Sequence, residues 1–252
     1  PTLQRDGRYR QDKSVTYIYD IFSKKLTEVA PFTVDLLLPS GAENLNYVLY
    51  TDESPYKMQR EWLDRLPFDI YSVNVHTGAK RLIGRSYRTA PKWSVNGKWA
   101  VMYDPIAQVW NKFDGATGKV VNISDAIGYP MFVESYDKPA PAPAYGIAGW
   151  TADGNNVFLY DAYDWWKIDL TGERQPECLT KGYGRKHGKS IRKMTSNIDK
   201  DVFQKDEKVI VSLWDKDTMD EGVYQLDMKG RLRKLMEGNY VYTIHRFSDN
   251  TG

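Results

Sequence analysis

The chain has 252 residues with 35 basic and 33 acidic side chains, which gives a formal net charge of +2. Its 41% hydrophobic and 13% aromatic content is ample for a packed core and excludes a disordered polyampholyte. No run approaches the roughly 18 apolar residues of a membrane helix, and the near-zero charge argues against nucleic acid as a partner.

The N-terminal residues 1–13 are polar and alternate in charge, which predicts a tail rather than a secretory leader. The single cysteine, Cys178, cannot form an internal disulfide. We therefore expect the fold to be held by burial alone.

From residue 14 onward one short pattern recurs five times: an aromatic residue, strand-forming residues, Asp or Asn, and a turn that usually ends in glycine. The acidic or amide residues of the five copies are Asp20, Asn74, Asp114, Asp169 and Asp227. Their side chains can bond the turn backbone, while glycine accepts a positive φ. A second strand-like segment follows each copy, at residues 26–29, 80–83, 119–123, 177–179 and 232–235. The sequence therefore predicts five β-hairpins.

A second recurring turn precedes these hairpins. It reads Trp93-Ser-Val-Asn96-Gly-Lys and Trp150-Thr-Ala-Asp153-Gly-Asn, with a degraded copy at residues 203–209. Apolar runs at residues 99–103, 157–160 and 209–214 follow it, as buried strands require. Repeated units of four short antiparallel strands, without helical periodicity between them, are typical of a β-propeller. A jelly roll or an immunoglobulin sandwich would not repeat the same turn five times.

We therefore predict an all-β fold, a β-propeller of four-stranded antiparallel blades spanning residues 14–252. About four blades are complete, at residues 35–83, 90–123, 147–179 and 200–235, and partial blades lie at 14–29 and 240–252. Two explanations of the partial blades remain open. The two ends could complete one shared blade, or the chain could be part of a larger ring, and we favour the second. Open blade edges could also pair in an oligomer.

Three longer loops interrupt the strands. Residues 53–67 are expected to contain a short helix with an apolar stripe, residues 129–145 a proline-rich extended segment, and residues 181–197 a basic loop. Such loops gather at the faces of a propeller, where they either cover blade edges or meet ligands.

Catalytic motifs are missing from the sequence. There is no Gly-x-Ser-x-Gly, and His76, His187 and His245 lack the close spacing of zinc ligands. We therefore predict no catalytic residue, no metal and no cofactor. Asp52, Asp104 and Asp161 follow strand runs at matching points of their blades. They could be channel carboxylates of a glycosidase or simply caps of turns.

The Trp93 and Trp150 turns, together with the hairpin Tyr71-Ser-Val-Asn74-Val-His-Thr-Gly78, resemble the propeller of the prolyl oligopeptidase and dipeptidyl-peptidase family and the related TolB-like repeats. The resemblance covers nearly all of residues 14–252, and the insert at residues 52–67 is similar to the decorated blades of bacterial members. It implies that the propeller caps an α/β-hydrolase domain and filters peptide substrates. The paired glutamates that bind the peptide amino terminus in the dipeptidyl-peptidase type have no equivalent in this sequence. Glu53, Glu61 and Trp62, all within the insert, are therefore only weak candidates for substrate binding.

Three hypotheses follow. The first is a non-catalytic propeller segment of a periplasmic or extracellular bacterial serine peptidase, whose partner is a hydrolase domain or a peptide. The second is a stand-alone TolB-like propeller that binds a protein or a glycan. The third is a propeller glycosidase.

Overall fold

The computed structural model describes residues 15–31, 35–37, 46–63, 65–194 and 201–243. The predicted tail at residues 1–13 and residues 244–252 of the last partial blade lie outside the described residues. The chain divides into two compact units. Unit 1 comprises residues 1–38, 43–90 and 115–118, and unit 2 comprises residues 39–42, 91–114 and 119–252.

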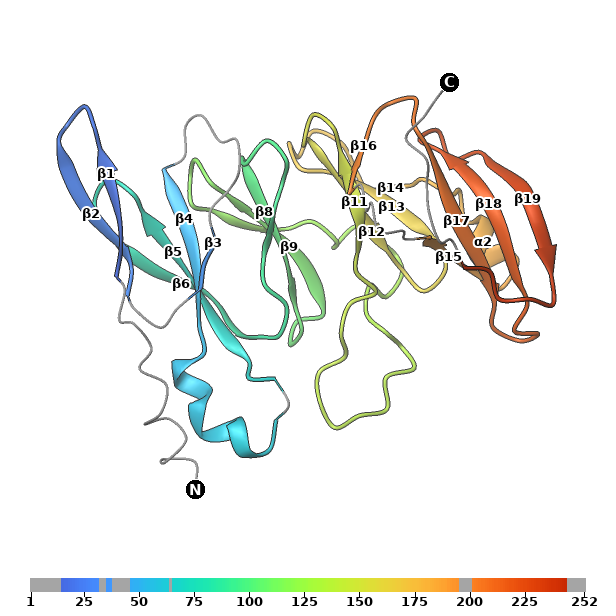
Figure 1. Ribbon diagram of the computed structural model, residues 1–252, viewed down its shortest axis with the longest axis horizontal. Coiled ribbons are helices and arrows are strands. Elements are labelled where there is room, and N and C mark those ends of the chain that lie inside the picture. Colours follow the sequence, from blue (N-terminus) through green and yellow to red (C-terminus); the bar gives the residue numbers. More distant parts are fainter. Residues whose placement is uncertain (1–14, 32–34, 38–45, 64, 195–200, 244–252) are drawn as a thin grey trace. The chain divides into compact units, whose positions relative to one another are not determined.

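Unit 1 contains a hairpin and one complete blade (Figure 1). The hairpin pairs β1 (Thr16–Asp20) with β2 (Lys25–Ala30). The blade has the order β3-β4-β5-β6, with β3 at Asp35–Leu37, β4 at Tyr47–Asp52, β5 at Phe68–Asn74 and β6 at Lys80–Tyr87. Val29 and Ala30 of β2 pack with Val48, Tyr50 and Val73 of the blade in one buried cluster.

Unit 2 contains three further sheets. The first has the order β10-β9-β8-β7, from β7 (Lys92–Trp93), β8 (Trp99–Asp104), β9 (Val109–Asp114) and β10 (Val120–Asn122). The second joins β11 (Ile147–Thr151), β12 (Asn156–Tyr160), β13 (Trp165–Asp169) and β14 (Glu177–Cys178), with β16 (Val202–Phe203) added beside β11. The third has the order β15-β17-β18-β19, with β15 at Lys189–Lys193, β17 at Lys208–Asp215, β18 at Glu221–Asp227 and β19 at Leu232–Gly238.

In each four-stranded sheet of the described chain, antiparallel strands lie side by side in chain order, which is the organisation of a propeller blade. Inside unit 2, consecutive sheets pack through shared apolar clusters. Val101 and Trp110 of one sheet meet Trp150 and Leu159 of the next, and Phe158 and Trp165 of that sheet meet Val211 and Leu213 of the last. The predicted fold class is confirmed: the chain folds into four-stranded antiparallel blades.

The recurring hairpin turn forms as the sequence predicts. Its Asp or Asn accepts a hydrogen bond from the backbone N–H two residues later, as in Asn74 with His76 (3.0 Å) and Asp227 with Lys229 (3.0 Å). The turn glycine Gly78 has a φ of 74°, a conformation that side chains disfavour. The same contact recurs in the hairpins of Asp20 and Asp169.

The structure differs from the sequence-based boundaries in the last blade, which were placed at residues 200–235. Its first strand is β15, which lies inside the predicted basic loop at residues 181–197. The segment at Val202–Phe203, expected to open this blade, instead pairs in parallel with β11 of the preceding sheet. Polar residues hide β15 from pattern analysis, because only Ile191 of its five residues is buried.

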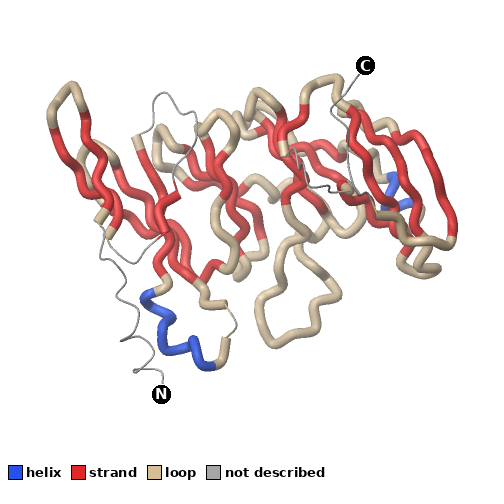
Figure 2. The backbone as a smooth tube through the Cα atoms, in the orientation of Figure 1, coloured by secondary structure: helices blue, strands red, loops and turns tan. Residues whose placement is uncertain are grey.

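Two short helices accompany the sheets, the 3₁₀ helix η1 (Ser54–Glu61) and α2 (Tyr183–Lys186). In the tube view η1 projects away from the strands of its blade (Figure 2). The helix expected in residues 53–67 is therefore present, but the expected apolar stripe does not face the core. No residue of η1 is buried, and Met58 and Trp62 are 83% and 74% exposed. In the described part of the chain, neither helix has the length and apolar character that crossing a bilayer requires.

Candidate functional site

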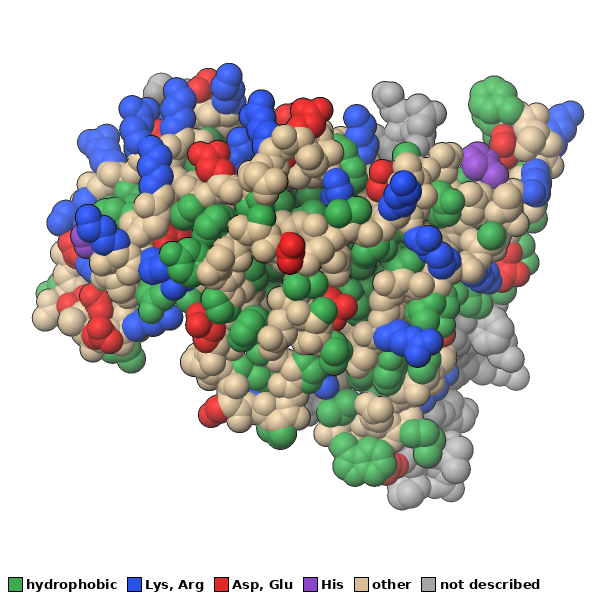
Figure 3. All heavy atoms as spheres, turned by 180° about the vertical axis from the view of Figure 1, so that it is seen from behind, with side chains coloured by type: hydrophobic (Ala, Val, Ile, Leu, Met, Phe, Trp, Pro, Cys, Tyr) green, Lys and Arg blue, Asp and Glu red, His purple; other side chains and the backbone are tan. Residues whose placement is uncertain are grey.

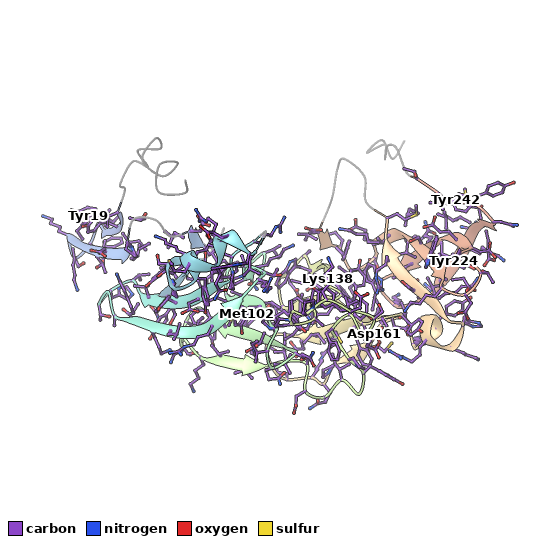
Figure 4. All side chains as sticks on the ribbon, turned by 90° about the horizontal axis from the view of Figure 1, so that it is seen from below. Tyr19, Met102, Lys138, Asp161, Tyr224 and Tyr242 are labelled. Atoms are coloured by element: carbon purple, nitrogen blue, oxygen red, sulfur yellow. The ribbon has the colours of Figure 1, made fainter. Side chains whose placement is uncertain are left out.

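Charged and aromatic side chains gather at the turn between β12 and β13 in unit 2. We call Asp161, Asp164, Arg185 and Arg192 the Asp161 cluster; Figure 4 labels Asp161. The two aspartates come from the β12–β13 turn, Arg185 from α2 and Arg192 from β15. The cluster thus joins the second sheet of unit 2 to the first strand of the third. Asp161 is one of the three candidate carboxylates of the sequence. The hydrogen bonds of its two oxygens therefore show whether the residue is available to a substrate.

Both oxygens of the Asp161 carboxylate are occupied. Oδ1 accepts the backbone N–H groups of Tyr163 (2.7 Å) and Asp164 (2.5 Å). Oδ2 accepts the indole N–H of Trp166 (3.1 Å) and forms an ion pair with Arg185 (3.0 Å). The residue is fully buried. Four donors fill the acceptor capacity of a carboxylate, so Asp161 has no free lone pair for a substrate.

Asp164 shapes the next turn in the same manner. Its Oδ1 accepts the hydroxyl of Thr180 (2.6 Å) and the N–H of Gly184 (2.9 Å), and its Oδ2 accepts the N–H of Arg185 (3.0 Å). Because Gly184 and Arg185 lie in α2, this buried carboxylate satisfies backbone donors of that short helix. Asp164 therefore fixes α2 on the sheet and brings Arg185 to Asp161.

Arg185 is held between two tyrosine rings. Its guanidinium carbon lies 3.8 Å from the ring centroid of Tyr129 and 5.0 Å from that of Tyr163. Burial acts to lower the pKa of Arg185, but the hydrogen bond and the negative charge of Asp161 outweigh it and raise the pKa. The buried Nε has no hydrogen-bond acceptor among the described residues. Its position between the rings lets the aromatic faces compensate for the missing acceptor.

Arg192 serves as a second link between the sheets. Its guanidinium donates to the backbone carbonyls of Ile191 (2.8 Å), Asp161 (2.7 Å) and Ala162 (3.2 Å). It also lies 4.7 Å from the ring centroid of Tyr160. Burial lowers the pKa of Arg192 and raises that of Tyr160 to about 12. At neutral pH the arginine stays charged and the phenol neutral, so neither group titrates in this range.

Taken together, these contacts make the Asp161 cluster a closed network of structural bonds. Each carboxylate oxygen is paired, and both arginines donate to groups of the protein itself. A general acid or base must instead reach a substrate with an available proton or lone pair. The arrangement is suited to holding two blades together and not to proton transfer.

The other two candidate carboxylates also cap turns. The Oδ1 atom of Asp52 accepts the N–H of Ser54 (2.8 Å), and that of Asp104 accepts the N–H groups of Ile106 and Ala107 (both 2.9 Å). Asp52 belongs to unit 1, whereas Asp104 and Asp161 belong to different sheets of unit 2. All three carboxylates thus accept hydrogen bonds from the backbone of their own turns.

The weak substrate-binding candidates all lie on or beside η1. Glu53 precedes the helix and pairs with Arg60 at 3.7 Å, with both side chains largely exposed. Glu61 is its last residue, and Trp62 follows as its C-cap. The hydroxyl of Tyr56 donates to Asp69 of β5 (2.5 Å), which anchors the helix to the blade. The structure therefore presents Trp62 to solvent from an anchored segment.

Sequence reasoning missed Asp164, Arg185 and Arg192 as parts of one site. The spacing Asp161-Ala-Tyr-Asp164 was a usable signal, since a second carboxylate three residues after a turn cap points to further backbone donors nearby. The partners of these carboxylates come from α2 and β15, both of which lie within the predicted basic loop at residues 181–197. In the described ranges, no three His, Cys, Asp or Glu side chains are arranged to hold a metal ion.

Comparison with known proteins gives structural neighbours only. No family model and no curated protein matches the chain. Among solved structures, it is similar to TolB from Acinetobacter baumannii, with 13% identity and a TM-score of 0.35 over 88% of this chain and 60% of that one. It is also similar to the propeller domain of the trilobed protease from Pyrococcus furiosus, with 13% identity and a TM-score of 0.39 over 81% and 57%.

A third neighbour is a prolyl endopeptidase, with 15% identity and a TM-score of 0.40 over 86% of this chain and 31% of that one. The chain thus spans between about a third and three fifths of the length of these proteins. The similar structures are β-propeller domains, of the kind that the sequence motifs resemble.

Proposed function

We propose that the chain is a non-catalytic propeller segment of a bacterial serine peptidase resembling the prolyl oligopeptidase family. In this proposal it caps an α/β-hydrolase domain and filters the peptides that reach it. The location proposed with it is the periplasm or the cell exterior. The proposal rests on the family-like turns of the sequence and on one feature of the structure, the insert that carries η1.

The insert supports the proposal because it exposes apolar surface from a fixed position. Met58 and Trp62 are 83% and 74% exposed, while Leu66 is buried and Tyr56 is bonded to Asp69. Exposed tryptophan on an anchored element is typical of contact surfaces, since it buries a large area at low entropic cost. A peptide substrate or a neighbouring domain could use this surface.

The carboxylates argue against a glycosidase. That chemistry needs an acid and a second carboxylate facing the same sugar, whereas Asp52, Asp104 and Asp161 bond the backbone of their own turns. A non-catalytic propeller requires no such pair.

The proposal is tested by labelling the native protein with a fluorophosphonate probe. This probe reacts with active serine hydrolases, so it reports whether the native polypeptide carries a hydrolase domain. Cells are fractionated, the polypeptide carrying this sequence is captured with an antibody, and its intact mass is measured. We expect a polypeptide well above 29.1 kDa, in the periplasmic or secreted fraction, that the probe labels. The isolated 252-residue chain should remain unlabelled.

A native polypeptide of 29.1 kDa that the probe does not label would overturn the proposal and support a stand-alone binding propeller instead. In the labelled protein, Trp62→Ala should raise the KM for peptides and leave kcat near its original value. Ile106→Ala is the matched control, because Ile106 is 67% exposed in the turn between β8 and β9, away from η1 in the sequence. Equal effects of the two variants would contradict the role of η1.

A further inference from the structure

The turn between the first two strands of a blade differs in one functional group between two neighbouring sheets of unit 2. The β7–β8 turn contains Asn96 and Gly97, whereas the β11–β12 turn contains Asp153 and Gly154. In both turns the side-chain Oδ1 atom accepts a hydroxyl group and a backbone N–H. The donors are Ser94 (2.7 Å) and Lys98 (3.1 Å) for Asn96, and Thr151 (2.5 Å) and Asn155 (2.9 Å) for Asp153. The turn itself therefore accepts either an amide or a carboxylate at this position.

The amide nitrogen of Asn96 has a separate role, because it joins the two turns. Nδ2 donates to the backbone carbonyl of Asp153 (2.9 Å) and to Oδ1 of Asn155 (3.3 Å). An ionised carboxylate at position 96 has no donor for these acceptors. It would also place a second negative charge beside Asp153, which disfavours the contact. The contact between the two turns thus depends on the amide and not on the shape of the side chain.

This amide belongs to the single Asn-Gly dipeptide of the sequence. Such a dipeptide is prone to deamidation, since glycine has no Cβ to hinder attack by its backbone nitrogen. In the reaction the nitrogen of Gly97 bonds to Cγ of Asn96, its proton passes to the side-chain NH2, and ammonia leaves. Water then opens the resulting imide to aspartate or isoaspartate. The net change replaces NH2 by OH on the group that joins the two turns.

The fold restrains each group that takes part in this reaction. Gly97 is buried, and its N–H donates to the carbonyl of Ser94 (2.8 Å), so the attacking nitrogen must first leave this bond. Cγ of Asn96 lies against the next turn, because a Cβ on Gly154 would approach it to 2.6 Å. The leaving nitrogen is held by its two acceptors. Reaction therefore requires the contact between the turns to open.

We propose that Asn96 is a deamidation site which the turn of the following blade protects, and that deamidation breaks the contact between these two turns. When the product is aspartate, the Oδ1 cap of the turn is kept, as Asp153 shows, while the bonds from Nδ2 are lost. Because ammonia has left, the contact does not re-form. This site does not depend on the proposed peptidase role.

The test incubates the full chain at mildly alkaline pH and follows deamidation by peptide mapping with mass spectrometry. A synthetic peptide of residues 92–100 gives the rate without the fold. We expect Asn96 to react at least about tenfold more slowly in the folded chain, since the reaction there needs a local opening. Equal rates in the chain and the peptide would overturn the protection.

A glycine substitution in the following turn tests where the protection comes from. Gly154→Ala places a methyl group against Asn96 and should accelerate deamidation at least about threefold, by opening the contact. Gly182→Ala is the matched control, because its φ of 70° is close to the 68° of Gly154 but a Cβ there meets nothing within 4 Å. Its deamidation rate should stay within about twofold of that of the original chain.

The consequence of deamidation is tested with Asn96→Asp, which has the aspartate product from the start. We expect its equilibrium constant of unfolding in urea to rise at least about fivefold, the equivalent of one lost hydrogen bond. Asn122→Asp is the matched control. Oδ1 of Asn122 accepts the N–H of Ser124 (2.9 Å), and its amide nitrogen has no acceptor among the described contacts. Its unfolding constant should change by less than about twofold.

Equal deamidation rates in Gly154→Ala and Gly182→Ala would overturn the protection by the following turn. Equal unfolding constants of Asn96→Asp and Asn122→Asp would overturn the role of the amide nitrogen. If Gly154→Ala does not fold, the comparison of chain with peptide and the pair of Asp variants still decide the outcome.

Discussion

Asp104 and Asp161 stand at the same point of successive blades but in different surroundings. Asp104 accepts two N–H groups of its turn at a position that is not fully buried. Asp161 accepts two similar donors and in addition an indole N–H and an arginine, and it is fully buried. The same residue type at the same repeat position therefore caps a turn in one blade and, in the next, caps a turn and also binds Arg185. The difference arises because α2 brings Arg185 to the second blade.

This contrast predicts unequal costs of substitution. Asp161→Ala leaves Arg185 and buried backbone donors without an acceptor, and we expect a loss of about 3 to 5 kcal/mol of unfolding free energy. Asp104→Ala is the matched control and should lose about 1 kcal/mol, since water can replace its contacts. Urea denaturation followed by tryptophan fluorescence measures both. Similar losses in the two variants would contradict the structural role of the Asp161 cluster.

Glu237 gives stability a pH dependence. Hydrogen bonds from Lys189 (2.5 Å) and Lys234 (2.9 Å) lower the pKa of Glu237 to about 2. A carboxylate whose pKa is lower in the folded state stabilises the fold above its unfolded pKa of about 4.3. That contribution is lost as the pH falls from there through about 2.

Glu237→Gln should therefore be less stable than the original chain at pH 7 by roughly 0.5 to 1 kcal/mol, the size of partly exposed ion pairs. The difference should shrink steadily between pH 5 and pH 2. Denaturation midpoints over this range test it, with Glu207→Gln as control because Glu207 caps a local turn and has no ion pair among the described contacts. A constant difference at all pH values would refute the assignment.

At the scale of single elements, the hairpins were predictable because their chemistry is local. Residues such as Asn74 and Gly78 shape a turn within five positions of the chain, whatever surrounds it. β15 was not predictable, because its assignment depends on pairing with β17 across a long connection. The Asp161 cluster was predictable only in part for the same reason. Asp161 was a candidate from the sequence, whereas Arg185 and Arg192 lie in α2 and β15, which the sequence pattern did not predict.

Gly149 of β11 is a second case in which the role of a residue depends on a distant part of the chain. Its φ is 155°, and a Cβ there would approach the ring of Phe203 to 2.5 Å and the carbonyl oxygen of Asp201 to 2.7 Å. The same carbonyl accepts the N–H of Trp150 (2.7 Å). We expect Gly149→Ala to cost roughly 2 to 4 kcal/mol, from backbone strain and overpacking, and to displace β16 from β11.

Thermal unfolding and hydrogen exchange at Trp150 measure these effects. Gly128→Ala is the control, because a Cβ at Gly128 meets nothing within 4 Å, and its stability should change by less than about 1 kcal/mol. If Gly149→Ala matches Gly128→Ala, the close contact between β11 and β16 does not constrain the fold.

At the scale of the whole chain, the sequence predicts the class of fold and not its connections. The recurring turns fix the number of hairpins, and the apolar runs locate the second strand of each blade. The sequence pattern does not predict the division into two compact units. Residues 115–118 group with unit 1, although β9 and β10 on either side of them belong to unit 2. On the face drawn in Figure 3, basic side chains gather at the upper left of the view, and acidic side chains are scattered over the rest of the face.

The path of the chain between the last two sheets limits how the repeat can be taken apart. After β15 enters the third sheet of unit 2, the chain returns to add β16 to the second sheet and only then comes back as β17. A cut between these repeats would strip an edge strand from one blade or the first strand from the other. Transplanting or duplicating either of these two blades alone should therefore fail, whereas an exchange of residues 147–238 as one unit would keep the strands of both sheets together.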